Sequence, residues 1–157
     1  MYSELNIRIN NLEETQKFAT ILSKLIAKPF FICLNGPIGS GKTTFAKYFI
    51  NQFSEKKINV PSPTFPIVQI YDLKKIKIWH YDLFRVENKK EFFNLDFDIA
   101  INDCVIVEWP NIFLEFFPKS RIELDFFDKD INVREIVVKL VGNHIMKDNL
   151  WRTLKKR

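Results

Sequence analysis

This sequence contains the stretch Gly36-Pro37-Ile38-Gly39-Ser40-Gly41-Lys42-Thr43. The stretch matches G-x-x-x-x-G-K-[S/T], the phosphate-loop motif, which requires a strand before it and a helix after it. The apolar residues 30–34 predict a buried strand before it, and apolar residues recur at helical spacing between positions 45 and 53. We therefore expect a strand, a glycine-rich loop and a helix that begins at Lys42.

The predicted loop has the chemistry of a nucleotide-phosphate site. Successive backbone N–H groups converge at the start of the helix, where the helix dipole is positive, so anions bind there. Lys42 is expected to reach the β- and γ-phosphates, and the Thr43 hydroxyl to hold Mg²⁺. The predicted phosphate-binding residues are Gly36, Gly39, Ser40, Gly41, Lys42, Thr43 and Thr44. The alternative is a glycine turn that precedes a helix by chance, and the complete motif with both flanks argues against it.

Length and composition predict one globular domain, residues 1–157. The chain has 157 residues, of which 46% are hydrophobic and 27% charged, enough for a core of its own. Cys33 and Cys104 lie in apolar runs and form no CxxC pair, so we expect buried thiols in a reduced, cytoplasmic protein. The first residues do not resemble a signal peptide, and the apolar runs are far shorter than a membrane span. No membrane partner is expected.

Hydrophobic periodicity and turn residues predict the other elements. Asn11 resembles a helix N-cap with Glu14 in the capping-box position, and Pro29 ends that helix. Further strands are expected at 5–9, 58–60, 67–71, 76–82, 104–108, 121–127 and 135–141, short helices at 88–95 and 112–117, a loop or turn at 96–101, and a last helix at 146–154. This order predicts an α/β protein with a three-layer P-loop NTPase fold, in which a mostly parallel central sheet gains antiparallel edge strands from two hairpins.

The segment 61–66 contains three prolines and predicts a stiff loop without regular structure. Such a loop presents the hydroxyl groups of Ser62 and Thr64. Two interpretations remain open on residue chemistry alone. The segment is either a rigid connector or a switch-type loop that senses a γ-phosphate.

Two predicted strands end in polar residues. By period-two alternation Ile78, His80 and Asp82 share one face, whose polar end predicts a strand that runs into a site and a polar cluster of His80, Asp82 and Arg85. The apolar run at 104–107 ends in Glu108. In phosphate-loop proteins an acid at this place supplies the second group of the Mg²⁺ site. A surface acid at the end of a strand is the alternative.

Four motifs stand in one order: the phosphate loop, Ser62-Pro63-Thr64-Phe65, His80-Tyr81-Asp82-Leu83-Phe84-Arg85 and Glu108-Trp109-Pro110. In this order and spacing the chain resembles the TsaE (YjeE) family of small bacterial ATPases, from about residue 11 to residue 142. The resemblance implies ATP hydrolysis in the synthesis of threonylcarbamoyladenosine in tRNA, together with a complex of the proteins TsaD and TsaB.

Matching positions imply roles for single residues. Lys42 would hold phosphate, Thr43 and Glu108 would hold Mg²⁺, and Glu108 would otherwise position water. Asp82 would be a second carboxylate near the metal, and Thr64 would belong to a switch-like loop. The resemblance also places Leu12, Thr15 and Arg134 near the adenine end of bound ATP or ADP, and Trp109 matches a family tryptophan. Two positions depart from the family pattern: Pro37 stands where Asp is usual, and Phe84 where Tyr is usual.

Other classes of protein remain to be distinguished. A small P-loop metabolite kinase needs an arginine-rich lid, whereas the six arginines of this chain are scattered and none lies between Arg8 and Arg85. A nucleotide-dependent binding module without turnover is harder to exclude. The basic helix or tail at about 145–157 is either a solvated end or a surface for tRNA or an acidic protein. The net charge of +5 favours a polyanionic partner only weakly.

Overall fold

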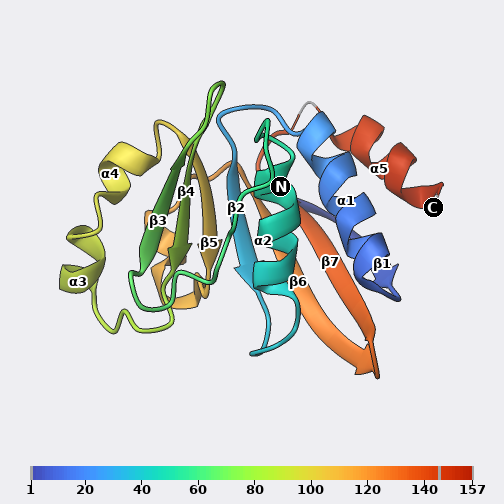
Figure 1. The fold of residues 1–157 in the computed structure, drawn as a ribbon, viewed down its shortest axis with the longest axis horizontal. Coiled ribbons are helices and arrows are strands. Elements are labelled where there is room, and N and C mark those ends of the chain that lie inside the picture. The colour runs from blue at the N-terminus through green and yellow to red at the C-terminus, as the bar shows by residue number, and fades with distance from the viewer. Residues whose placement is uncertain (1, 145, 157) are drawn as a thin grey trace.

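The computed structural model describes residues 2–144 and 146–156, so Ile145 and Arg157 of the basic C-terminal segment lie outside the described residues. Within them the chain forms one seven-stranded sheet with the order β1-β7-β6-β2-β5-β4-β3 (Figure 1). The strands are β1 (Tyr2–Ile9), β2 (Phe31–Asn35), β3 (Val68–Asp72), β4 (Lys77–Asp82), β5 (Cys104–Glu108), β6 (Arg121–Asp130) and β7 (Val133–Val141). The helices are α1 (Leu12–Leu25), α2 (Lys42–Asn51), α3 (Lys89–Phe93), α4 (Phe97–Ala100), the 3₁₀ helix η1 (Asn111–Phe116) and α5 (Lys147–Lys155).

The centre of the sheet is parallel, as predicted. Strand β2 pairs in parallel with β5 and with β6, and β5 pairs in parallel with β4. Strands β3 and β7 are antiparallel to their neighbours β4 and β6. The hairpin of β6 and β7 does not reach the edge, however, because β1 pairs antiparallel with β7 and takes the outer position. The fold is therefore an α/β fold with a mixed sheet. Its parallel strands all have their carboxyl ends on the same side of the sheet.

The two faces of the sheet pack against different helices. On one face Ile32 and Leu34 belong to a core with residues of α1, α2 and α5. On the other face Phe31 and Cys33 belong to a second core with residues of α3, α4 and η1. Successive residues of a strand point to opposite faces, so the continuous apolar run of β2 is buried on both. Helices α1 and α2 lie side by side over the first face, and α3 and α4 lie beyond the β3 end of the sheet (Figure 1).

The first helix begins as its sequence predicts. The Asn11 side chain accepts a hydrogen bond from the backbone N–H of Glu14 at 2.9 Å, which satisfies one of the free donors at the helix start. The Glu14 carboxylate in turn accepts the backbone N–H of Asn10 at 2.8 Å, one residue before the position of a standard capping box. A cap of this kind stabilises a helix by about 1 kcal/mol.

Two local predictions are wrong. No strand forms at 58–60, because the backbone N–H and C=O of Ile58 bond to the Asn51 side chain at 2.9 and 3.2 Å instead of to another strand. The predicted loop at 96–101 contains the short helix α4, whose first turn uses the Asp96 carbonyl as acceptor for two N–H groups. Burial of Phe97 and Ala100 in the second core stabilises that turn.

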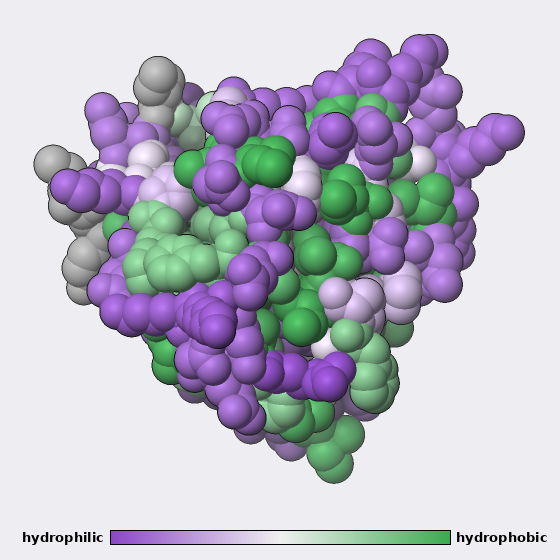
Figure 2. Space-filling model, turned by 90° about the vertical axis from the view of Figure 1, so that its left-hand side faces the viewer, coloured by the Kyte–Doolittle hydropathy of each residue, from purple (hydrophilic) through white to green (hydrophobic). Residues whose placement is uncertain are grey.

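Both cysteines are buried, free thiols, as predicted. Burial raises the pKa of the Cys33 thiol and of the Cys104 thiol above the usual range. On the side of the molecule with α3, α4 and β3, hydrophobic residues reach the surface among hydrophilic ones (Figure 2), and Ile70, Phe93 and Ile99 are exposed there. No helix in the described part of the chain is both long enough and apolar enough to cross a membrane.

Candidate functional site

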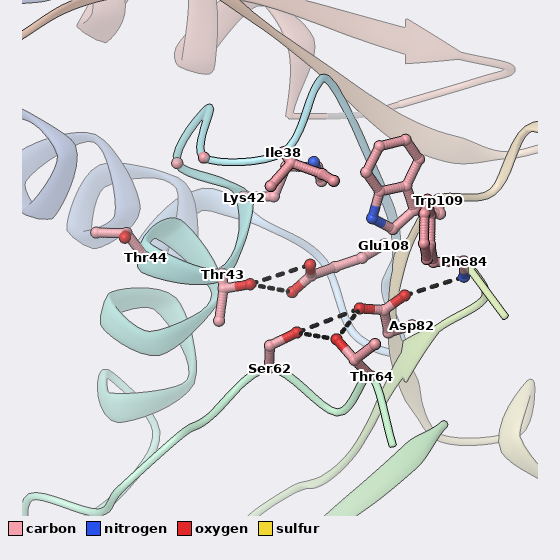
Figure 3. A pocket seen from close by; sticks show the side chains of 12 residues that line it. Ile38, Lys42, Thr43, Thr44, Ser62, Thr64, Asp82, Phe84, Glu108 and Trp109 are labelled. Carbon is pink, nitrogen blue, oxygen red and sulfur yellow. Dashed lines mark hydrogen bonds between the residues drawn. The ribbon is translucent and has the colours of Figure 1, made fainter. Parts of the chain in front are cut away.

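A cavity of about 390 Å³ lies at the carboxyl ends of the parallel strands (Figure 3). It is lined by Ile38, Gly39, Gly41, Lys42, Thr43, Thr44, Ser62, Thr64, Asp82, Phe84, Glu108 and Trp109. Ligands of open parallel sheets bind at the carboxyl ends of the strands, because the loops that follow the strands converge there. The structure thus brings the glycine loop, the proline-rich segment and both predicted carboxylates to one cavity.

The glycine loop has a backbone that its glycines alone allow. Gly36 has a φ of +146°, and a Cβ atom on it would lie 2.7 Å from the Ser40 Oγ and 2.8 Å from the Phe126 carbonyl oxygen. Gly41, the N-cap of α2, has a φ of +108°. Ser40 is fully buried, and its hydroxyl has no hydrogen-bond partner in residues 2–144 and 146–156. Helix α2 begins at Lys42 as predicted, so its free N–H groups point into the cavity and suit an anion.

Lys42 folds back onto its own loop. Its Nζ donates to the carbonyl oxygens of Gly36 and Pro37, and lies 4.2 Å from the centroid of the Trp109 ring. Burial lowers the pKa of the Lys42 ammonium, an effect that the Glu108 and Asp82 carboxylates oppose. Trp109 reaches this place from a left-handed backbone with a φ of +57°, an uncommon conformation for a bulky residue. The ammonium therefore already lies at the phosphate loop, held by neutral partners.

Glu108 ends β5 as a buried carboxylate with 2% of its surface exposed. The Thr43 hydroxyl lies 3.0 Å from each of its two oxygens (Figure 3). The His80 Nε2 lies 2.9 Å from the Glu108 Oε1. The first turn of α2 and the end of β4 thus hold one carboxylate between them.

Asp82 ends β4 and is also buried. Its Oδ2 accepts hydrogen bonds from the hydroxyls of Ser62 at 3.2 Å and Thr64 at 3.0 Å, and its Oδ1 accepts the backbone N–H of Phe84 at 3.0 Å (Figure 3). The two hydroxyl oxygens lie 2.9 Å apart, and because each hydroxyl has a single hydrogen, either one can donate to the other in place of Asp82. The proline-rich segment 61–66 is therefore tied to the end of β4 by its side chains.

The donor set of the cavity fits Mg²⁺ with phosphate and not a metal held by protein alone. In the part of the chain that the structure describes, no group of three His, Cys, Asp or Glu side chains could hold a metal ion. The candidate ligands are the Thr43 hydroxyl and the Glu108 carboxylate, which meet at 3.0 Å. Oxygen ligands suit Mg²⁺, which commonly takes one or two protein groups and completes its octahedron with water and substrate phosphates.

The predicted adenine-end residues lie outside the cavity lining. Arg134 is the second residue of β7, opposite Ile9 of β1, and its side chain forms an ion pair with Asp128 at 2.9 Å. Leu12 is the first residue of α1 and is exposed, whereas Thr15 is buried. Strand β1 is antiparallel to β7, β7 is antiparallel to β6, and β6 is parallel to β2. Strands β1 and β2 therefore run in the same direction, and their carboxyl ends lie on the same side of the sheet. These residues therefore lie on the same side of the sheet as the phosphate loop, but they do not line the cavity.

The predicted cluster of His80, Asp82 and Arg85 is wrong. His80 contacts Glu108, while the Arg85 guanidinium lies 5.3 Å from the centroid of the Phe65 ring and donates to the Phe65 carbonyl oxygen at 3.4 Å. The alternation along β4 placed His80 on the site face correctly. It could not identify the partner, because Glu108 comes from another strand.

The motif, the strand–loop–helix geometry and the acid on the next strand are those of a phosphate-loop site. The family described as threonylcarbamoyl adenosine biosynthesis protein TsaE matches residues 9–136. The tRNA threonylcarbamoyladenosine biosynthesis protein TsaE of Rickettsia prowazekii is 34% identical over 127 residues, which cover 80% of this chain and 88% of that protein. The protein of the same name from Bacillus subtilis is 31% identical and covers 89% of this chain and 88% of its own length.

A solved structure is similar as well. The crystal structure of YdiB from Bacillus subtilis superposes with a TM-score of 0.80 at 28% identity, covering 98% of this chain and 97% of that one. The chain therefore belongs to the TsaE family, and the resemblance in its motifs is confirmed. The role of this family lies in the biosynthesis of threonylcarbamoyladenosine in tRNA, which is a step of tRNA processing.

Proposed function

We propose that this protein binds ATP with Mg²⁺ in the cavity and hydrolyses it as a component required for threonylcarbamoyladenosine modification of tRNA, acting with a complex of TsaB and TsaD. The observation that carries the proposal is the contact of Thr43 with Glu108 in a cavity that is lined by residues of the phosphate loop. We further propose the three-layer P-loop NTPase fold and a cytoplasmic location.

Phosphate binding falls to the loop and Lys42. The N–H groups at the start of α2 supply donors, and Gly36, Gly39, Ser40, Gly41 and Thr44 shape the loop around them. The Lys42 ammonium exchanges the carbonyl oxygens of Gly36 and Pro37 for phosphate oxygens. The phosphate oxygens carry a negative charge that the carbonyl oxygens lack, so the exchange adds a charge–charge attraction to the hydrogen bonds of the ammonium. The adenine end is assigned to Leu12, Thr15 and Arg134.

The carboxylates act on the metal and on the attacking water. Thr43 and Glu108 would hold Mg²⁺, which when bound neutralises the charge of the phosphates. The Glu108 carboxylate also accepts a hydrogen bond from the water that attacks. Asp82 lies on the adjacent strand, opposite Glu108 in register, and Thr64 links it to the segment 61–66. That segment is assigned as the switch-type loop that distinguishes ATP from ADP.

Two other functions are weaker candidates. Among the described residues that line the cavity there is no arginine, so a metabolite kinase would lack the groups that clamp an acceptor. A nucleotide-dependent binding module without turnover agrees with the three hydrogen bonds that Asp82 already accepts. Measurement of hydrolysis with and without partners separates this second candidate from the proposed ATPase.

The test is a reconstitution with TsaB, TsaD, the threonylcarbamoyl-adenylate synthase and unmodified tRNA. Modification over many turnovers should require this protein and hydrolysable ATP. Lys42→Ala should remain folded but bind ATP at least about 100-fold more weakly by calorimetry, because it removes the charged phosphate ligand. It should also fail to support the cycle. Modification that proceeds equally well without this protein would overturn the proposal, and an unchanged ATP affinity of Lys42→Ala would overturn the loop assignment.

A salt series addresses the C-terminal segment. If Lys147, Arg152 and Lys155 of α5 face tRNA or an acidic partner, then affinity for that partner should fall as salt rises.

A further inference from the structure

His80 is a buried ionisable residue that the proposed function leaves without a role. Its side chain is fully buried on β4, on the same face as Ile78 and Asp82. Ile78 belongs to the apolar core, whereas Asp82 lines the cavity. His80 thus occupies the position where the core ends and the site begins.

The polar contact of the His80 ring is with Glu108. The Nε2 lies 2.9 Å from the Glu108 Oε1, and an ionised carboxylate only accepts hydrogen bonds, so Nε2 carries a proton and donates it to this contact. The Nδ1 is buried and has no partner in the described residues. Within the described residues, the hydrogen bond that the ring makes is the one to Glu108.

Glu108 needs such a contact more than an aspartate would. Its side chain has one more rotatable bond, so its carboxylate can take more orientations at the same backbone position. The Thr43 hydroxyl lies 3.0 Å from each of the two Glu108 oxygens. A second donor on Oε1 from β4 removes the freedom of the carboxylate to turn about the Thr43 hydroxyl.

We infer that His80 is a positioning residue whose Nε2–H fixes the Glu108 carboxylate so that it faces the Thr43 hydroxyl and the cavity. This inference rests on the proposed function, in which Glu108 serves the metal and the attacking water. Residues that orient metal ligands through a hydrogen bond typically change activity or metal affinity by about 10–100-fold when they are lost.

Three substitutions distinguish the effect of the Nε2–H donor from the effect of the volume of the ring. His80→Gln places an amide N–H near the former Nε2, His80→Asn places it near the former Nδ1, and His80→Leu keeps volume without a donor. Partner-stimulated hydrolysis at saturating ATP should fall about 10–100-fold in His80→Leu and His80→Asn but stay within about threefold in His80→Gln. The Mg²⁺ concentration for half-maximal hydrolysis should rise in the two slow variants, while ATP affinity stays close to that of the parent chain.

Ile78→Val is the matched packing control, because Ile78 lies on the same face of β4 but is paired with Cys104, at the opposite end of β5 from Glu108. It should hydrolyse ATP at the parent rate. Thermal unfolding of every variant shows whether it is folded at the assay temperature. If folded His80→Leu keeps the parent rate, or if folded His80→Gln is as slow as His80→Leu, then His80 does not position Glu108.

A readout on the nucleotide-free protein is independent of hydrolysis. The chain has two histidines, so His144→Gln identifies the His80 ring signals in nitrogen-15 NMR. We expect a proton on Nε2 that exchanges slowly with solvent, and faster exchange with a shifted signal in Glu108→Ala. A neutral ring that carries its proton on Nδ1 would overturn the inference. If the NMR result is as expected but the parent chain hydrolyses no ATP with its partners, then the His80–Glu108 contact is supported and the proposed ATPase function fails.

Discussion

Two neighbouring strands of this sheet end in buried carboxylates that are held by different kinds of structure. Asp82 of β4 lies opposite Glu108 of β5 in a parallel pair, and both are 2% exposed. Glu108 is held by Thr43 from α2 and His80 from β4. Asp82 is held by the hydroxyls of the segment 61–66 and by a backbone N–H of its own turn. One carboxylate therefore depends on regular elements and the other on a loop.

This difference predicts different roles for the two regions. Helices and strands hold a group more precisely than loops do, which suits a ligand that must stay in one place. A loop that is tied to a carboxylate by hydroxyl groups can exchange those bonds when a ligand arrives, which suits a sensor. Substitutions at Glu108 should therefore affect the chemical step, whereas substitutions in the segment 61–66 should affect communication with partners.

The largest expected effect comes from Glu108→Ala. Partner-stimulated hydrolysis should fall at least about 100–1,000-fold, because the carboxylate that serves the metal and water is lost. ATP affinity should stay within about an order of magnitude, because the phosphate loop remains intact. A phosphate-release assay and calorimetry measure the two quantities, and Asp82→Ala is the matched comparison. Hydrolysis at the normal rate in Glu108→Ala would assign the catalytic role to Asp82.

An intermediate effect is expected from Thr64→Ala. The nucleotide-free protein should lose about 1.5–3 kcal/mol of unfolding free energy, because a hydrogen bond to a buried carboxylate is removed. The ratio of partner affinities in the ATP and ADP states should move towards one, because the loop is no longer tied to Asp82. Denaturant unfolding and partner titrations measure both, and Thr64→Ser keeps the hydroxyl as control. An unchanged ratio would make the segment 61–66 a rigid connector.

The smallest expected effect comes from Trp109→Leu, next to Glu108. The ring faces the Lys42 ammonium at 4.2 Å in this structure. A cation–π contact of about 0.5–1 kcal/mol lost from the nucleotide-free state should tighten ATP binding by roughly two- to fivefold. Calorimetry measures it, and Trp109→Phe, which keeps a ring, should change affinity less. Binding that weakens tenfold would show that Trp109 contacts the nucleotide instead.

The local parts of the fold and the site could be predicted from the sequence. Helix α2 begins at Lys42 and β5 spans Cys104–Glu108, both as expected. The signals for these elements, a glycine motif and an apolar run that ends in an acid, lie within a few residues of the structure they specify. The proline-rich segment and the cap at Asn11 were predictable for the same reason.

The contacts between distant elements could not be predicted in this way. The outer position of β1 depends on its pairing with β7, more than a hundred residues away. The strand expected at 58–60 does not form, because the Asn51 side chain bonds to the Ile58 backbone. His80 was placed on the correct face, but its contact with Glu108 joins two strands whose register no local pattern contains.

Because both cysteines are buried, the rate at which they react with a thiol reagent can report how often this chain unfolds. Alkylating reagents attack the thiolate, and both thiols combine burial with a raised pKa. Labelling of the native chain should therefore wait for the core to open, and its rate would report the frequency of that opening. Because the two native thiols do not react in the folded chain, a dye would label only a cysteine introduced at position 62. The signal of that dye would then report on the proline-rich segment.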